Sequence, residues 1–398
     1  MGIKFWIILA VMVLAVLIFL IGLVLLVVPT IIEKSLNKVE FHPPYSISNK
    51  AKQLHQTLQI MDWHCDSLLW NRSLLKRANY GHVDVPRLIE GNVLIQMFTA
   101  VTKSPSGQNY QENKADSDTI TSLAVVQAWP IPAWSSLFQR AKHQADRLHK
   151  FAAHSQGKLR IVKNQTDLQT AIEDHQRAIQ SGTGKFTVGM LGIEGCHALD
   201  GDLDNIDRLV QAGYRMISLH HFFDNKLGGS LHGTDKGGLT EFGKQVVKRL
   251  EELEIIIDVA HSSPEVVSDV LDRVTRPLVV SHTGLYGVCA SPRNIPDKLL
   301  KRIADQGGLV AIGYWDGAVC DITPGGVVRT MRYAIDLLGE DHVALGSDYD
   351  GSTTVLFDTS ELAILTDTML EQGFTEQEIK KIMGGNSMQF LQQYLPQD

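Results

Sequence analysis

The feature that most constrains the fold of this chain is a repeated alternation between short apolar runs and longer charged segments with helical periodicity. The alternation begins near residue 51, and each apolar run has the length of one strand buried on both faces. Parallel strands joined by helices form α/β folds, and eight repeats favour a closed (β/α)₈ barrel, the TIM barrel. In chain order the eight runs end at Asp66, Val101, Glu194, His221, His261, His282, Trp315 and Asp348.

The segments between these runs predict the surrounding helices. Ser263 followed by Pro264 is a typical helix start. The longest connection, residues 102–186 after the second strand, is an insertion with a polar loop and about three helical segments, and a final helix is expected within 373–398. A doubly wound sheet is the alternative fold, and no linker divides residues 51–398. Helices are expected over residues 205–213, 240–254, 264–275, 296–307, 326–339 and 359–372.

The N-terminus carries a different signal, an uncharged apolar run over residues 5–28. A helix of this length spans about 36 Å, enough to cross a hydrocarbon layer ~30 Å thick. We therefore predict a single-pass membrane anchor (1–28) followed by a tether (29–50), with a cleaved signal peptide as the rival interpretation. Flanking charges orient the helix weakly, and we expect the body outside the cytoplasm, periplasmic or extracellular. The net charge of −7 without a cluster of Lys and Arg argues against nucleic-acid binding.

Polar side chains stand at or beside the ends of six of the eight predicted strands. The carboxyl ends of barrel strands meet at one face, where the active sites of such folds are built. Each of these residues alone has an ordinary structural explanation, such as a helix cap or a half-buried histidine. Together they favour a shared site, because burying several ionisable groups without a metal or partners is costly. The residues are His64, Asp66, Glu194, His221, His261, His282 and Asp348.

Three of the histidines, one aspartate and a glutamate able to bridge form a ligand set for two divalent cations. Nitrogen and oxygen ligands of this kind favour Zn²⁺ over Ca²⁺ or Mg²⁺. Two such ions can share a water, lower its pKa and polarise a carbonyl. Asp348 would then act as general base and His221 would stabilise the oxyanion. The four cysteines lack the spacing of a structural zinc site, and no GxSxG motif predicts a serine nucleophile.

An ordered set of short motifs resembles the membrane (renal) dipeptidase family, peptidase family M19, of the amidohydrolase superfamily. The resemblance covers about residues 55–395. It implies a binuclear zinc dipeptidase on a (β/α)₈ barrel that hydrolyses dipeptides, and a homodimer is expected from the family. The motifs are His64-Cys65-Asp66, Gly192-Ile193-Glu194-Gly195, Leu219-His220-His221, Asp258-Val259-Ala260-His261, Ser281-His282, Arg293-Asn294-Ile295-Pro296-Asp297 and Gly346-Ser347-Asp348-Tyr349-Asp350-Gly351.

The resemblance also implies a role for each site residue. The metal ligands would be His64 and Asp66 for one zinc, His261 and His282 for the other, and Glu194 bridging both. His221 would contact the scissile carbonyl, Arg293 would bind the free carboxylate of the dipeptide, and Asp348 would serve the nucleophilic water. A guanidinium suits this task because it pairs with a carboxylate through two hydrogen bonds.

Further expectations follow from the same resemblance. A disulfide between Cys289 and Cys320 is expected, and Cys65 should point away from the ligands that flank it. Gly313-Tyr314-Trp315 departs from the family pattern and leaves the side-chain preference of the site open. Two alternative functions stay open: hydrolysis of N-acyl amino acids or lactones by the same centre, and a membrane receptor or scaffold without turnover.

Overall fold

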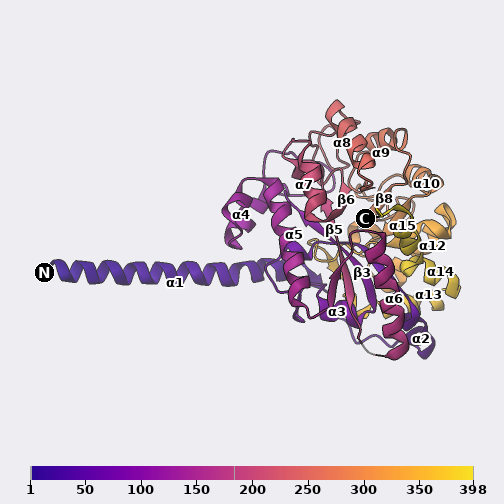
Figure 1. The fold of residues 1–398 in the computed structure, drawn as a ribbon, viewed down its shortest axis with the longest axis horizontal. Coiled ribbons are helices and arrows are strands. Elements are labelled where there is room, and N and C mark those ends of the chain that lie inside the picture. The colour runs from indigo at the N-terminus through magenta and orange to yellow at the C-terminus, as the bar shows by residue number, and fades with distance from the viewer. Residues whose placement is uncertain (1, 183, 398) are drawn as a thin grey trace.

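The strands of this protein close into a parallel barrel, seen in a computed structural model that describes residues 2–182 and 184–397 (Figure 1). Barrel strands that follow one another in the chain are neighbours in space, and β10 pairs back with β2. All of these pairings are parallel, so the predicted (β/α)₈ barrel is confirmed and the doubly wound alternative is wrong. The barrel strands are β2 (Ile60–Cys65), β3 (Val93–Val101), β5 (Thr187–Glu194), β6 (Tyr214–Ser218), β7 (Ile256–Asp258), β8 (Val279–Thr283), β9 (Leu309–Ile312) and β10 (Val343–Leu345).

A layer of helices surrounds the barrel, and the hydrophobic core lies between the two layers. In α8, Val246, Val247 and Leu250 are buried at helical spacing and belong to the same apolar cluster as Val280 of β8. The predicted start of α9 is confirmed, because the Ser263 side chain accepts a hydrogen bond from the Val266 amide. The helices of this layer outside the insertion are α2 (Asn49–Thr57), α3 (Val85–Glu90), α7 (Asn205–Ala212), α8 (Glu241–Glu252), α9 (Pro264–Leu271), α10 (Asp297–Asp305), α11 (Asp316–Val319), α12 (Pro324–Leu338) and α13 (Ala363–Glu371).

The insertion after β3 contains the expected polar loop and helical segments. It also contains a strand that the sequence pattern does not predict, β4 (Leu159–Ile161). This strand pairs with the first residues of β5 and extends the sheet there. Only three residues of β4 form strand, so its apolar signal is too short to stand out. The helical elements of the insertion are α4 (Thr119–Val126), the 3₁₀ turn η2 (Ile131–Trp134), α5 (Leu137–His154) and α6 (Gln165–Ser181).

The C-terminal segment differs from the single helix expected there. It consists of α14 (Glu376–Lys380), a π-helical turn (Lys381–Gly385) and α15 (Asn386–Tyr394). The break coincides with Gly384, where an added Cβ would lie 1.9 Å from the carbonyl oxygen of Gln59. The helix is therefore interrupted where the chain must pass close to the backbone just before β2.

The N-terminal helix α1 (Ile3–Leu36) extends from the body as one long rod (Figure 1). Among the described residues it alone is long and apolar enough to cross a membrane, by length and composition, over Lys4–Leu36. The expected tether differs from the structure at its start, since the helix continues through Pro29. Beyond it, β1 (Lys38–Val39) pairs with β11 (Thr354–Val355), so this stretch is docked on the barrel.

Candidate active site and metal centre

The seven polar residues predicted from the strand ends come together at the mouth of the barrel. Glu194 is the last residue of β5, His64 and His282 lie within β2 and β8, and Asp66 directly follows β2. The other three lie in loops, each three residues after the end of its strand: His221 after β6, His261 after β7 and Asp348 after β10. None of the seven is more than 8% exposed.

Glu194 lies at the centre of this cluster. Its Oε1 is 3.2 Å from Nε2 of His261, 3.4 Å from Nε2 of His282 and 3.6 Å from Nε2 of His64. Its Oε2 is 3.3 Å from Nε2 of His221. One carboxylate is thus surrounded by four imidazole rings.

The protonation of two of these rings follows from their outer hydrogen bonds. The Ser281 hydroxyl donates its proton to Asp258 Oδ2 at 2.6 Å. The serine oxygen can then only accept, so the Nδ1 atoms of His64, at 3.2 Å, and His282, at 2.9 Å, must be the donors. In the neutral form that binds metals, each ring therefore points its Nε2 lone pair at Glu194. For His64, burial lowers the pKa, but the charges of Asp66, Asp348 and Asp258 outweigh it and raise the pKa. Such outer partners are typical of metal-ligating histidines.

His221 has the same arrangement. Its Nδ1 is 3.2 Å from the carbonyl oxygen of Lys103, which can only accept a hydrogen bond. Burial lowers the pKa of His221 to about 4, so the neutral ring carries its proton on Nδ1 and points a lone pair at Glu194. Several lone pairs therefore converge on a carboxylate, an arrangement that repels itself unless positive charge lies between the groups.

The donor atoms fit divalent metal ions. Among the described residues, three groups have all their ligand atoms within 4.8 Å of one another: Glu194–His261–His282, His64–Asp66–Glu194 and His64–His282–Asp348. The first two share the glutamate. Donors ~2.0–2.1 Å from a tetrahedral zinc lie about 3.3 Å apart. The distances from Glu194 Oε1 to its histidine neighbours are close to this value, and the Nε2 atoms of His261 and His282 are 2.9 Å apart. Among the described residues, buried Nε2 of His64 has no hydrogen-bond partner.

The pKa shifts of the cluster also indicate that its charges are not balanced by protein groups alone. Burial, followed by the charge of Arg293, lowers the pKa of His261 well below its usual value, which keeps the ring in the neutral form that binds metals. Burial and the neighbouring Asp66 carboxylate raise the pKa of Glu194. Burial also raises the pKa of Asp348, and Asp66 and Glu194 add to that rise against the opposing charges of His64 and Arg293. Bound divalent ions would offset this repulsion between carboxylates.

Backbone conformation marks two of the site residues. His261 has a φ of +61° and Asp348 a φ of +58°, in the left-handed region that residues with a side chain rarely adopt. Such strain costs of order 1 kcal/mol or more and clusters at functional sites. The turns after β7 and β10 thus hold these two side chains over the mouth at an energetic cost.

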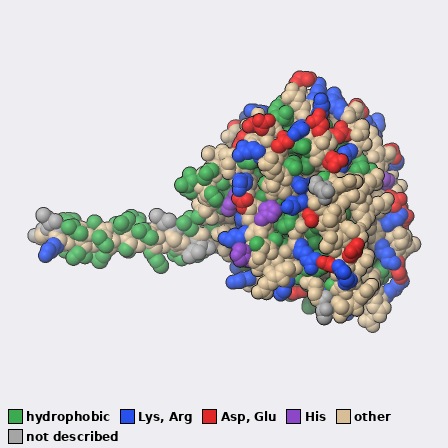
Figure 2. All heavy atoms as spheres, viewed as in Figure 1, with side chains coloured by type: hydrophobic (Ala, Val, Ile, Leu, Met, Phe, Trp, Pro, Cys, Tyr) green, Lys and Arg blue, Asp and Glu red, His purple; other side chains and the backbone are tan. Residues whose placement is uncertain are grey.

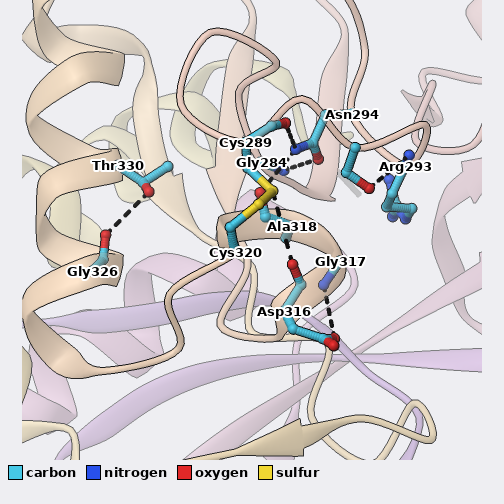
Figure 3. Close-up of a disulfide and its surroundings, with 11 residues drawn as sticks. Gly284, Cys289, Arg293, Asn294, Asp316, Gly317, Ala318, Cys320, Gly326 and Thr330 are labelled. Carbon is cyan, nitrogen blue, oxygen red and sulfur yellow. Dashed lines mark hydrogen bonds between the residues drawn. A yellow bond between two sulfur atoms is a disulfide. The ribbon is translucent and has the colours of Figure 1, made fainter.

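Arg293 lies in the loop after β8, next to Asn294 (Figure 3). Its Nη2 donates to the carbonyl oxygen of His282 at 3.0 Å and lies 3.2 Å from Nε2 of His261. Its Nη1 is buried and has no partner among the described residues, so it is available to an anionic group of a ligand.

The expected disulfide between Cys289 and Cys320 is present and ties the loop of Arg293 to the segment after β9 (Figure 3). Asn294 reinforces the link, since its Nδ2 donates to the carbonyl oxygens of Cys289 and Ala318. Cys65 is a free, buried thiol within the main apolar cluster, so it takes no part in the ligand groups.

The cluster opens into a cavity of about 310 Å³. Several of its walls come from residues that the sequence analysis did not single out. Tyr110 of the insertion accepts a hydrogen bond from Trp315 Nε1 at 2.9 Å, and both side chains line the cavity with Phe222. Only Trp315 had a signal in the sequence, as part of the motif that departs from the family pattern. The remaining walls include Ile32 and Leu36 of α1 and Ile120, Leu123 and Val126 of α4.

Comparison with known proteins identifies relatives along most of the chain. A protein of Klebsiella pneumoniae, described as the uncharacterized protein in the pqqA 5′ region, is 31% identical over 259 residues, which cover 61% of this chain and 92% of that protein. Dipeptidase aclJ of Aspergillus oryzae is 26% identical over 363 residues, which cover 85% of this chain and 79% of that protein.

A solved structure shows the same fold. The metallo peptidase from Rhodobacter sphaeroides, liganded with a phosphinate mimic of the dipeptide L-Ala-D-Ala, superposes with a TM-score of 0.68 at 23% identity and covers 85% of this chain and 99% of its own. The family model for membrane dipeptidase matches residues 48–395, nearly the whole body that carries the site. The chain therefore belongs to the membrane dipeptidase family, peptidase family M19, a family of metallo-dipeptidases.

Proposed function

We propose that this protein hydrolyses the peptide bond of dipeptides at a centre that binds two divalent cations, zinc by the chemistry of its ligands. The observation that carries the proposal is the shared position of Glu194, which belongs to two of the three ligand groups and faces imidazole nitrogens. His64 and Asp66 would hold one ion, His261 and His282 the other. When bound, the ions would supply Lewis-acid activation of a water and of the scissile carbonyl.

The protein's own residues would position the substrate. Arg293, with its unpartnered Nη1, would bind the C-terminal carboxylate of the dipeptide. Fixing that carboxylate places the preceding peptide carbonyl over the cluster, where His221 lies 3.3 Å from Glu194. Nδ1 of His221 is held by the Lys103 carbonyl oxygen, so its Nε2 would face the scissile carbonyl. The neutral ring carries no proton on Nε2, so it would stabilise the oxyanion only once it has taken one up.

Asp348 would carry the proton. As the water oxygen bonds to the carbonyl carbon, the Asp348 carboxylate takes the proton of the water, then delivers it to the amine nitrogen as the C–N bond breaks. Asp348 lines the cavity, and its Oδ1 is 3.9 Å from Nε2 of His64.

The proposal extends to the setting of the enzyme. We propose that α1 anchors the chain in a membrane with the body outside the cytoplasm. The apolar length of α1 and the disulfide support this, because disulfides persist in oxidising compartments.

Chelation tests the metal centre. Prolonged treatment of the full chain with a chelator should abolish hydrolysis of Ala-Ala, and added Zn²⁺ should restore it together with about two ions per chain by metal analysis. Activity that survives complete removal of metal would contradict the proposal. Faster turnover of N-acyl amino acids or lactones than of any free dipeptide would favour the alternative amidohydrolase activity.

A further inference from the structure

The cavity has an apolar wall built from two helices that the catalytic cluster does not use. We define this wall as Ile32 and Leu36 of α1 together with Ile120, Leu123 and Val126 of α4. Ile32 and Leu36 are four residues apart and lie on one side of α1. Ile32 packs against a buried cluster that contains Ile120 and Leu123.

The wall stands across the barrel mouth from Arg293. Around the closed barrel, β8 is separated from β3 by four strand positions in either direction. Arg293 follows β8, whereas α4 follows β3, so their loops lie on opposite sides of the mouth. Glu194, His221 and His261 line the same cavity. A substrate whose carboxylate is held by Arg293 would therefore extend its acyl side toward the wall.

Apolar surface continues from the wall to the outside of the body. Val125 of α4 is 39% exposed, and Ile131 and Trp134 of η2 are 72% and 36% exposed. Figure 2 shows hydrophobic side chains on the edge of the body from which α1 leaves. The last turns of the anchor helix are thus both a wall of the cavity and the end of the membrane-spanning candidate.

We propose that this wall selects substrates with a large apolar group on the acyl side of the scissile amide, held at their other end by Arg293. The inference rests on the proposed hydrolytic function and specifies its substrate class. Two sources share this chemistry: a dipeptide with a large apolar N-terminal residue, and an amino acid that carries a medium-length fatty acyl chain. The helix that anchors the protein would at the same time determine which substrates it accepts.

The experiment compares three substrates on the full chain in detergent micelles, loaded with Zn²⁺: Ala-Ala, Phe-Ala and N-octanoyl-alanine. The wild type should cleave at least one of the two apolar substrates with a higher kcat/KM than Ala-Ala. In Leu36→Gln and Val126→Gln, the ratio of kcat/KM for the preferred apolar substrate to that for Ala-Ala should fall roughly ten-fold, because the amide withdraws apolar surface from the bound group. Both positions are partly exposed, so folding should tolerate the changes.

Val125→Gln is the matched control, since Val125 precedes Val126 on α4 but does not line the cavity, and it should leave the ratio at the wild-type value. A preference for Phe-Ala identifies the dipeptide as the source. A preference for N-octanoyl-alanine identifies the acylated amino acid; the wall then still selects the substrate, but the centre carries the alternative amidohydrolase activity in place of the proposed dipeptidase activity. An unchanged ratio in both wall variants, or a wild type that prefers Ala-Ala, would overturn the inference while leaving hydrolysis intact. If the protein cleaved none of the three substrates, that result would instead contradict the proposed function.

Discussion

At the scale of single residues, the centre depends on hydrogen bonds that fix the protonation of its rings. Ser281 and Asp258 hold the rings of His64 and His282 so that both Nε2 lone pairs face inward. Asp348 differs from these ligands, because it lies at the cavity surface on a left-handed turn. That position suits proton transfer to a bound substrate.

Asp348→Asn tests this role. Asparagine keeps the size of the side chain but cannot take a proton, so kcat should fall by about 10²- to 10⁴-fold. Metal content should stay near two ions per chain, as measured on the same sample. Asp316→Asn, at an exposed carboxylate after β9, should keep wild-type turnover. Loss of metal from Asp348→Asn would recast Asp348 as a ligand, as its proximity to His64 and His282 would allow.

We predict that His55, which lies outside the candidate site, makes the stability of the protein depend on pH. It is buried in α2, with Nδ1 2.8 Å from the Thr366 hydroxyl and Nε2 3.1 Å from the Gly91 carbonyl oxygen. Burial lowers its pKa from 6.5 to about 4, although the bond to Gly91 partly opposes the shift. Folding thus favours the neutral ring, so the stabilisation is complete above pH 6.5 and is lost as pH falls through 4.

His55→Gln keeps an amide donor but does not titrate in this range. Between pH 6.5 and 4 the wild type should lose up to about 3 kcal/mol of unfolding free energy more than the variant does, measured by urea denaturation. His154→Gln, at an exposed histidine, should follow the wild type. Parallel pH profiles for wild type and His55→Gln would show that His55 is not the titrating group.

At the scale of elements, the loop after β8 is held by covalent and polar links. The disulfide closes a stretch with a sequence separation of 31 residues, and Asn294 bonds the same two segments. Removing the bond with Cys289→Ser and Cys320→Ser should lower the free energy of unfolding by about 2–4 kcal/mol. KM for dipeptides should rise, because Arg293 stands on the loosened loop.

A reductant provides the control for this prediction. It should shift the thermal midpoint of the wild type to that of the double variant and leave the variant unchanged. An equal response of both proteins would show that the reductant acts elsewhere.

The last turns of α1 are the second element with a specific role. Glu33 is buried against Arg72, whose guanidinium also pairs with Asp350, two residues beyond Asp348. Asn37 adds a contact, accepting a hydrogen bond from the Ser352 amide at 2.8 Å. The N-terminal helix is therefore linked through one buried arginine to the loop that carries the proposed general base.

Two truncations separate the apolar run from the docked segment. A chain that begins at residue 29 keeps the contact between Glu33 and Arg72 and should have nearly the thermal midpoint of the full protein. A chain that begins at residue 41 leaves Arg72 without Glu33, and breaking a buried pair costs about 3–5 kcal/mol, so its midpoint should fall by several degrees. Equal midpoints for the two truncations would mean that the docked segment contributes no stability.

At the scale of the whole molecule, the candidate membrane helix α1 and the candidate active site lie next to each other. α1 leaves the body beside α4 (Figure 1). Both helices line the cavity into which the candidate metal cluster opens. A soluble barrel needs no such arrangement. The anchor proposed for α1 would therefore hold the cavity close to the membrane surface.

The sequence alone determined the barrel and the seven polar residues at its mouth. Repeats of strand and helix leave periodic signals, and parallel strand ends must converge, so residues such as His64 and Asp348 could be placed together although 284 positions separate them. Tertiary structure alone decided the rest. The break at Gly384, the short strand β4 and the wall of Ile32 and Val126 arise where segments distant in sequence touch without any period. Which apolar residue of a helix faces a cavity depends on the partner packed against it, and that partner leaves no local signal in the chain.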